Sequence, residues 1–427
     1  MARKFQYPPS VKPGIPKKPH LPEGWYFKSF DDVVEVVERP AQLQDNQEYQ
    51  LVTAKRSRGG IVPRERLLGE QILTKTQYYT NAGDFLISRR QIIHGACGIV
   101  PPELDGAVVS NEYSTLITKP DLLAEYLAYF SHSTYFQQTC FQSSVGVDVE
   151  KMIFKLNDWL KYKIPLPHLS EQKKIVEILN SVDEAIASTQ AVIDQTRKVK
   201  QGLLQQLLTR GIGHTRFKES AIGKIPETWE VVSCEQVCTK ITDGEHLTPK
   251  FIEEGQPLIS AKDIGEFGVD FSDPKYVSEA DFVKMQQRCN PESGDVLIVS
   301  RGATIGRTGL NVTSRKFALM GSVILAKPDI NKITGEYLSY SFQSPQVQTE
   351  MLKLSGSSAQ QAIYLKDIKH HKLPLPLLEE QRKITIILST IDEYIKAKTL
   401  SILQMQKLKN GLMQDLLTGR VRVGITS

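Results

Sequence analysis

The sequence lacks the features of an exported, membrane-bound or disulfide-stabilised protein. Its 427 residues contain no run of 18 apolar residues and do not open with a signal-peptide pattern, so we expect a soluble protein of the cytoplasm. The cysteines are odd in number and irregularly spaced, which excludes a disulfide scaffold and fits a reducing compartment. They are Cys97, Cys140, Cys234, Cys238 and Cys289.

Motifs for catalysis and for metal binding are also missing. A phosphate-binding loop needs Gly-x4-Gly-Lys-Ser/Thr, whereas the segment 302–308 is one residue short and carries Arg307 in place of the lysine. Neither Cys234-x3-Cys238 nor His370-His371 has the spacing of a structural zinc site. The sequence shows no set of nucleophile, base and orienting partner. We therefore expect a chain that is not an enzyme and that binds no metal or cofactor itself.

What the sequence does contain is a long segment that occurs twice. Residues 164–209 and 373–418 superimpose without a gap at an offset of 209, which aligns Gln172 with Gln381 and Thr209 with Thr418. Each copy opens with a Pro-x-Pro pair, which can precede a helix but cannot lie inside one, and ends near a glycine that can cap a helix. The repeat predicts two helices, each roughly 58 Å long at about 1.5 Å per residue.

The apolar residues of each copy recur at steps of three and four, which is the spacing of a coiled-coil seam. Polar residues interrupt the seam at matching steps, Lys200 with Lys409 and Thr189 with Lys398, and such residues can fix the register of a helix pair. We expect the two helices to pair as an antiparallel, coiled-coil-like spacer; an ordinary core helix is the alternative interpretation. The seam residues are Ile175, Leu179, Val182, Ile186, Ile193, Leu203, Leu207, Ile384, Leu388, Ile391, Ile395, Ile402, Leu412 and Leu416.

The two blocks outside the repeat are weakly related to each other. Each opens with a Pro-Glu-x-Trp segment, and each contains a glycine turn followed by an apolar strand, at 83–89 and 294–301. Strand and helix signals alternate without a βαβ rhythm, so the predicted fold is α+β: two globular domains separated by two long helices, with a pseudo-twofold internal repeat. The expected segments are a flexible, basic, proline-rich tail at 1–24, a first domain at 25–168, a spacer helix at 169–212, a second domain at 213–377, and a second helix with a C-terminal tail at 378–427.

Positive charge is concentrated in one segment of each domain. The segment 51–101 holds eight basic and three acidic residues, and the segment 284–327 holds seven and two. The net charge of the whole chain is only +5, so bulk charge does not indicate nucleic-acid binding. A local excess of this kind is typical of a surface that faces phosphates, and a solvated face is the alternative.

These features together resemble the DNA-specificity subunit of type I restriction-modification systems over almost the full length of the chain. The most specific features are the Pro-x-Pro, acidic-Gln and basic-basic-Ile openings at 165–175 and 374–384. In the second domain, the segments 242–249 (Thr-Asp-Gly-Glu-His-Leu-Thr-Pro) and 294–309 also resemble motifs of this family. The first domain has no counterpart of the former segment, and 55–60 is its best candidate for a recognition loop.

The resemblance implies that two target recognition domains, in opposite orientation, each read half of a bipartite sequence in double-stranded DNA while the paired helices set the unread gap. It also implies partners: two modification subunits that dock on the helices and supply S-adenosylmethionine, and restriction subunits that use ATP and magnesium. The target bases and the methylated adenines do not follow from the sequence.

Basic and polar side chains of both domains are the candidates for contact with phosphates and base edges. In the first domain they are Lys55, Arg56, Arg58, Lys75, Arg89, Arg90 and His94. In the second domain they are Thr242, Asp243, His246, Thr248, Lys250, Arg301, Thr304 and Arg307. Two alternatives stay open: the recognition portion of a fused or stand-alone methyltransferase or nuclease, and a two-domain scaffold that does not bind DNA.

Overall fold

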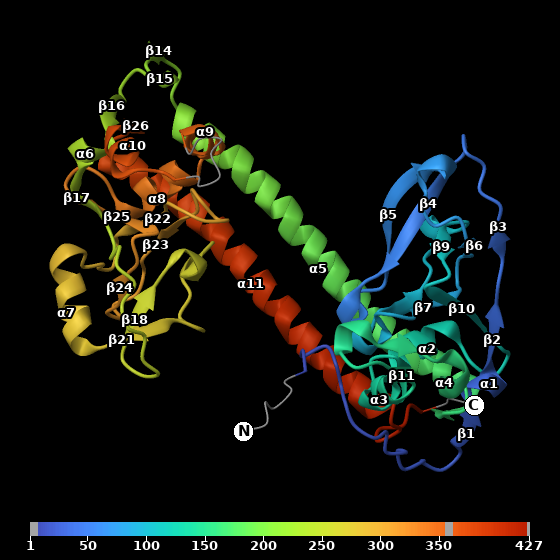
Figure 1. Ribbon diagram of the computed structural model, residues 1–427. Helices are drawn as coiled ribbons and strands as arrows, with labels where there is room; N and C mark the ends of the chain where they lie inside the picture. Colours follow the sequence, from blue (N-terminus) through green and yellow to red (C-terminus); the bar gives the residue numbers. More distant parts are fainter. Residues whose placement is uncertain (1–6, 355–361, 425–427) are drawn as a thin grey trace. The chain divides into compact units, whose positions relative to one another are not determined.

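The computed structural model describes residues 7–354 and 362–424, which form two compact units (Figure 1). Unit 1 combines Met1–Ser188 with Leu403–Ser427, and unit 2 is Thr189–Ile402. The repeated segments form two long helices, α5 (Leu169–Arg210) of 42 residues and α11 (Leu378–Leu416) of 39 residues. Each unit is therefore a globular part plus one half of each long helix, whereas the sequence predicts five consecutive segments.

The globular part of unit 1 contains two larger, mostly antiparallel sheets and the two-stranded sheets β1-β13 and β11-β12. The strand orders of the two larger sheets are β2-β10-β7-β8 and β3-β6-β9-β4-β5. All four residues of β7 are buried, and the strand follows a turn at Gly83, where φ is +89°. The strands are β1 (Tyr26–Ser29), β2 (Val34–Val37), β3 (Pro40–Ala41), β4 (Glu48–Ala54), β5 (Ile61–Leu68), β6 (Gln77–Tyr79), β7 (Phe85–Ser88), β8 (Cys97–Ile99), β9 (Val108–Ser110), β10 (Tyr113–Thr118), β11 (Ser144–Val145), β12 (Ile153–Phe154) and β13 (Lys163–Leu166).

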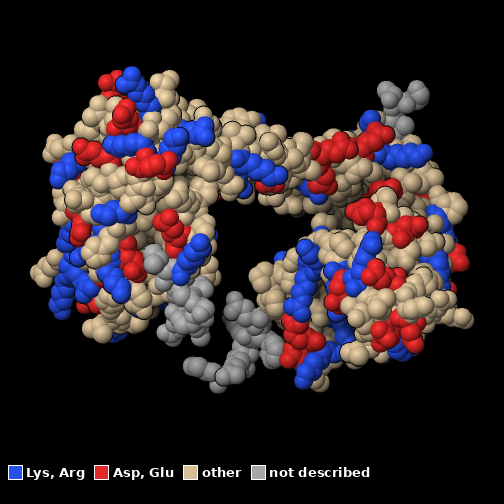
Figure 2. Space-filling model, turned by 90° about the horizontal axis from the view of Figure 1, so that it is seen from above, with Lys and Arg blue, Asp and Glu red and all other residues tan. Residues whose placement is uncertain are grey.

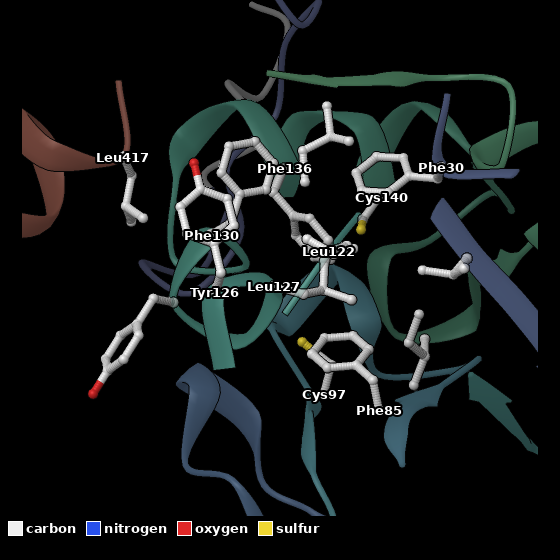
Figure 3. Packing of buried hydrophobic residues seen from close by; sticks show 14 of the residues in the cluster. Phe30, Phe85, Cys97, Leu122, Tyr126, Leu127, Phe130, Phe136, Cys140 and Leu417 are labelled. Carbon is white, nitrogen blue, oxygen red and sulfur yellow. The ribbon is translucent and has the colours of Figure 1, made fainter. Parts of the chain in front are cut away.

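Short helices cover the first of these sheets and build an aromatic core. They are α1 (Phe30–Val33), α2 (Ala124–Phe130), α3 (Thr134–Gln142) and α4 (Leu156–Trp159). Phe30 stacks on Trp159 with ring centroids 3.9 Å apart, and both side chains are fully buried. Leu417, just after α11, belongs to the same buried cluster (Figure 3), so the long helices are part of the core of this unit.

Unit 2 repeats the central sheet of unit 1 with the strand order β17-β25-β22-β23. Its strands are β14 (Phe217–Ser220), β15 (Gly223–Pro226), β16 (Glu230–Ser233), β17 (Cys238–Asp243), β18 (Gln256–Ile259), β19 (Ile264–Gly265), β20 (Gly268–Val269), β21 (Lys275–Val277), β22 (Val296–Val299), β23 (Thr308–Leu310), β24 (Ala318–Leu319), β25 (Val323–Pro328) and β26 (Lys372–Leu375). Its helices are α6 (Cys234–Val237), α7 (Glu279–Arg288), α8 (Gly335–Gln343), α9 (Pro345–Leu354) and α10 (Leu365–His370). The buried strand β22 after Gly294 corresponds to β7 after Gly83, as the sequence predicts.

The halves of α5 and α11 pair in antiparallel fashion within each unit. In unit 1, Glu171 of α5 binds Arg422, which follows α11, and Asp183 further along α5 binds Lys409 of α11. Residue numbers therefore rise along one helix as they fall along the other. In unit 2 the same relation holds between Lys200 and Asp392.

The predicted seam lies on the inner faces of these helices. All fourteen seam residues are buried or half-buried. Ile175 and Leu179 share one buried cluster with Leu416, and Leu207 shares another with Ile384 and Leu388. Within the described ranges, no helix is both long enough and apolar enough to span a membrane.

The prediction of a flexible N-terminal tail is wrong for residues 7–24, and its residues 1–6 lie outside the described part of the chain. Val11 is 4% exposed and packs into the core of unit 1. Gln138 and Gln142 of α3 donate hydrogen bonds to the carbonyl groups of Pro13 and Gly14, at 3.4 and 3.0 Å. The composition of this segment indicates little secondary structure, but it does not show that a single apolar residue can anchor an extended strap.

Candidate nucleic-acid interface

One edge of the central sheet of unit 2 gathers most of the residues that the sequence predicts for DNA contact in the second domain. Strands β17 and β22 both pair antiparallel with β25, and Asp243 and Ile298 lie opposite the same residue, Ile324. The two strands therefore run in the same direction and end at the same edge. The segments that follow them, 244–250 and 300–307, both begin at this edge, which we call the unit 2 edge.

A tight turn at 320–322 ties these two segments together. Gly321 donates its N–H to the carbonyl of Glu245 at 2.7 Å, and Ser300 donates its N–H to the carbonyl of Ser322 at 2.9 Å. Gly244 has no room for a side chain, since a Cβ there would lie 2.2 Å from the carbonyl oxygen of Leu319. The backbone of the unit 2 edge is thus fixed by hydrogen bonds and close packing.

Asp243 holds the first segment in place. Its side chain is 13% exposed, and its two oxygens lie 2.5 Å from Nη2 of Arg288, which ends α7, and 2.9 Å from Nε2 of His246. Because both oxygens are engaged, the carboxylate positions the loop in this structure and is not free to accept from a base. His246, Thr248 and Lys250 are exposed on the outer side of the loop. Thr242, the preceding residue of β17, is half-buried.

The second segment presents two arginines. Arg301 is exposed directly after β22, and Arg307 is exposed near the end of the loop, where Nη1 donates to the carbonyl of Ile264 at 3.2 Å. Gly306 has a φ of +83°, and its carbonyl accepts from Nε2 of Gln348 at 2.9 Å. Thr304 between the arginines is half-buried. The loop therefore holds two guanidinium groups outward on a braced backbone.

In unit 1, the residues that follow the corresponding strand β7 are engaged with the protein. Arg90 forms a two-point ion pair with Glu112, at 2.6 and 3.0 Å, and this partner raises the pKa of the guanidinium. Arg89 is half-buried, and its Nη1 lies 3.5 Å from the carbonyl of Asn111. Arg89 lines a polar hollow of about 580 Å³ beside Tyr113. Both arginines border the sheet, but neither is a fully free cation in this structure.

The predicted recognition loop of unit 1 closes the hairpin between β4 and β5. Lys55 donates its N–H to the carbonyl of Gly60 at 2.9 Å, while its side chain is exposed. Arg56 forms an ion pair with Glu150 at 2.6 Å. Ser57 and Arg58 have φ values of +57° and +60°, a left-handed conformation that non-glycine residues adopt at a cost in energy.

Arg58 and His94 of the predicted contact residues are turned inward, and Lys75 is exposed but bound within its own unit. Arg58 turns inward: Nε and Nη2 are buried without a hydrogen-bond partner among the described residues, and burial lowers the pKa of the guanidinium. His94 is 1% exposed, with Nδ1 3.1 Å from the Ser10 hydroxyl, and burial lowers the pKa of its imidazole. Lys75 donates to the carbonyl of Gly69 at 2.8 Å. Arg58 and His94 thus face the interior of the unit, whereas the exposed Lys75 is bound to a backbone carbonyl of its own unit.

Charge and metal-binding groups are distributed without a single dominant cluster. Figure 2 shows basic and acidic side chains interspersed over the face in view. In the part of the chain that the structure describes, no three His, Cys, Asp or Glu side chains come together as a metal site would require. All five cysteines are free thiols.

The motifs that carry the family resemblance lie where each globular part joins its helix. Glu171, from the opening of α5, accepts from the indole N–H of Trp25 at 3.1 Å. Glu380, from the opening of α11, accepts from that of Trp229 at 2.9 Å. The first proline of each Pro-x-Pro pair lies in strand β13 or β26, which pair antiparallel with β1 and β16.

The glutamine of each motif completes this joint through backbone atoms. Gln172 is fully buried, donates to the carbonyls of Asp121 and Pro167 at 2.8 and 3.0 Å, and accepts from the N–H of Leu123 at 3.0 Å. Gln381 makes the corresponding three bonds in unit 2, all at 2.9 Å. The repeated acidic-Gln pair is therefore a structural joint.

Sequence reasoning missed several residues that position these elements. Arg288 was counted as part of a basic segment, but nothing local indicates that it binds Asp243, 45 positions away. Arg422 and His214 bind Glu171 and Glu380, and both lie in the connections after a long helix. The offset of 209 aligns Arg422 with Gly213 and not with His214, so the repeat itself does not indicate either residue.

Comparison with known proteins identifies the family. The family described as Type I restriction modification DNA specificity domain matches the chain twice, over residues 22–196 and 226–404. The MjaVIII specificity subunit of Methanocaldococcus jannaschii, a type I restriction enzyme, is 28% identical over 425 residues, which cover 94% of this chain and 94% of that protein.

Two solved structures share the fold. One comes from a study of the assembly and conformational transition of a type I restriction-modification system; it covers 94% of this chain and all of that one, with 20% identity and a TM-score of 0.59. The other is the S subunit of a type I system from M. genitalium, which covers 94% of this chain and 97% of its own, with 14% identity and a TM-score of 0.55. Because the family matches both globular parts and well over half of the sequence, this chain belongs to the type I restriction-modification DNA specificity family and carries two such domains.

Proposed function

We propose that this chain reads a bipartite sequence in double-stranded DNA, with the globular part of each unit contacting one half of the target. The observation that carries the proposal is the unit 2 edge, where two braced loops leave His246, Lys250, Arg301 and Arg307 exposed. Arginine and lysine neutralise phosphates, and arginine, threonine and histidine side chains can hydrogen bond to base edges in the major groove.

In unit 1 the corresponding contacts are proposed for the β4–β5 hairpin, where Lys55 is exposed and Arg56 is half-exposed. The paired helices act as the spacer that sets the unread gap. If both globular parts contact the same side of the duplex, the half-site centres lie about one helical turn, roughly 10 bp, apart.

Chemistry is assigned to partner subunits. Two modification subunits dock on the helices and bring S-adenosylmethionine for adenine methylation, and restriction subunits bring ATP and magnesium. This chain is non-catalytic and acts in the cytoplasm. The relatives support this assignment, since the M. jannaschii protein is itself a specificity subunit of a type I restriction enzyme.

A gel-shift titration tests DNA binding. The purified chain, alone and with its modification subunits, is mixed with duplexes that contain the sequences methylated in cells carrying both, and the affinity is measured from 50 to 200 mM salt. We expect binding that weakens steeply with salt, because each phosphate contact releases counterions. Binding that does not depend on salt or on sequence would contradict the proposal.

A methylation assay tests the division of labour. We expect adenine methylation only when the modification subunits and S-adenosylmethionine are both added. Methylation by the purified chain without them would show that the chain is itself an enzyme.

A further inference from the structure

A lysine, an aspartate and a tyrosine meet at the same place in both units. In unit 1, Nζ of Lys409 lies 2.6 and 2.7 Å from the two oxygens of Asp183, and the hydroxyl of Tyr129 donates to one of these oxygens at 2.8 Å. The lysine comes from α11, the aspartate from α5, and the tyrosine from α2. One cluster thus links both long helices to the globular part.

Unit 2 contains the same cluster with the roles of the helices exchanged. Nζ of Lys200, on α5, lies 2.5 Å from Asp392 of α11, and the hydroxyl of Tyr340, on α8, donates to Asp392 at 2.8 Å. The offset of 209 that relates the two copies carries Asp183 to Asp392 and Lys200 to Lys409. We call these clusters the unit 1 triad and the unit 2 triad.

The lysine and the tyrosine of each triad are largely shielded from solvent, whereas the aspartate side chain is 41% exposed in unit 1 and 17% exposed in unit 2. The lysine side chains are 18% and 8% exposed in unit 1 and unit 2, and the tyrosines are 9% and 7% exposed. The ammonium groups also lie over the tyrosine rings, 5.3 and 5.5 Å from the ring centroids. Burial and the neighbouring carboxylate raise the pKa of both tyrosines, so each hydroxyl keeps the proton that it donates.

The triads can fix the register of the helix pair, which the apolar seam alone does not fix. An apolar seam with steps of three and four buries a similar area when one helix slips by a heptad, because the hydrophobic effect is not directional. A buried lysine is satisfied only where its carboxylate faces it, since an unpaired charge in that position is strongly unfavourable. The tyrosine extends this constraint to the globular part of the unit.

We propose that the two triads fix the helix register and the rotation of each globular part about its helix pair, and so set the length of the unread gap in the DNA target. This inference rests on the proposed function. The six residues are positioning residues: they do not contact DNA, and they determine gap length without determining the half-site sequences.

The test uses the full chain, co-expressed with its modification subunits in cells whose methylated adenines are sequenced. The variants are Lys200→Met with Lys409→Met, which removes both cross-helix pairs, and Tyr129→Phe with Tyr340→Phe, which removes only the two hydroxyl groups. Lys174→Met is the matched control, because Lys174 pairs with Glu177 at 3.0 Å on an exposed turn of α5 alone. Lys200→Arg with Lys409→Arg keeps the charges.

For the lysine-to-methionine variant, we expect unchanged half-sites and an unread gap that varies in length instead of having one fixed length. Discrimination against gaps about three base pairs longer or shorter, which is the length of a one-heptad slip at about 1.5 Å per residue, should fall roughly tenfold, the scale of one charge-assisted hydrogen bond. The double phenylalanine variant should show the same change to a smaller extent, the double arginine variant should restore discrimination in part, and the control should match the wild type.

Two results would overturn the inference. In the first, the variants direct normal methylation and the gap between the half-sites is as sharply defined as in the wild type. In the second, the bases of the half-sites themselves change. If circular dichroism shows that the methionine variant does not fold, the phenylalanine variant, which keeps the rings, is tested instead. The inference is then judged from the gap length and half-site bases of its methylated sequences. A wild-type chain that directs no bipartite methylation would instead refute the proposed function on which this inference rests.

Discussion

Replacing Gln381 by leucine should loosen unit 2 at its joint with α11. The side chain is fully buried and makes three hydrogen bonds at 2.9 Å: to the carbonyls of Lys332 and Pro376, and from the N–H of Thr334. Leucine fits the space but leaves these three backbone groups without a partner. At about 1 kcal/mol for each lost bond, the free energy of unfolding of unit 2 should fall by about 3 kcal/mol.

Hydrogen exchange read by mass spectrometry measures this effect for each unit separately. A loss of about 3 kcal/mol speeds exchange of the protected amides of unit 2 by about a hundredfold, if these amides exchange through opening of the unit. Gln172→Leu should transfer the effect to unit 1, because Gln172 makes the corresponding bonds there. Gln190→Leu is the control on α5, since Gln190 is exposed and donates to Asp194 of the same helix at 2.9 Å.

The reasoning would be refuted in either of two ways. Gln381→Leu could change exchange in unit 2 by less than about fivefold, which would mean that the joint contributes little. Alternatively, Gln190→Leu could destabilise the protein as much as Gln381→Leu, which would mean that the buried bonds are not the cause.

Three further predictions concern the interface and the core of unit 1. Replacing Arg301 and Arg307 together by glutamine should reduce the slope of log affinity against log salt by about 1.8 in a gel-shift titration, because each phosphate contact contributes about 0.9; an unchanged slope would place both arginines off the DNA backbone. Arg288→Met should speed hydrogen exchange in the segment 244–250 and leave β22 protected, because Asp243 loses one of its two partners; equal protection would show that Arg288 does not hold the loop. Burial, together with nearby positive charges, lowers the pKa of His132 from 6.5 to about 4. Between these values the unfolded chain binds a proton that the folded unit excludes, so stability should fall by about 2 kcal/mol from pH 6.5 to 5. Urea titrations should show a smaller fall for His132→Gln, and parallel curves would contradict the assignment.

The long helices and the α+β class could be predicted because they depend on local patterns. A seam with steps of three and four, repeated at a fixed offset, specifies helices whatever surrounds them. The buried strands β7 and β22 could be found for the same reason, since a glycine turn and a short apolar run are contiguous in sequence. The family motifs could be recognised, but their role as joints required coordinates, because Gln172 and Gln381 bind carbonyl groups that any residue carries.

The candidate site was harder to predict. The direction in which a side chain points, and the residue with which it pairs, depend on residues that are distant in the sequence. Arg58 and Arg301 look equivalent in sequence, yet one guanidinium points inward and the other outward. His94 lies in a glycine-rich segment that suggests a surface loop, but the N-terminal strap covers it through Ser10. Asp243 appears as a free carboxylate until Arg288 is placed beside it. Residue type and local charge therefore indicate a candidate interface but do not show which of its side chains are free.

The joints between helices and globular parts also bear on how sequences in this family can vary. Each joint uses one tryptophan, one glutamate, one glutamine and a set of main-chain groups. It therefore depends little on the identity of other side chains. Loops at the unit 2 edge, which we propose to contact DNA, can change their residues while the attachment to the helix stays the same. An architecture of this kind separates the part that must diversify from the part that must be kept.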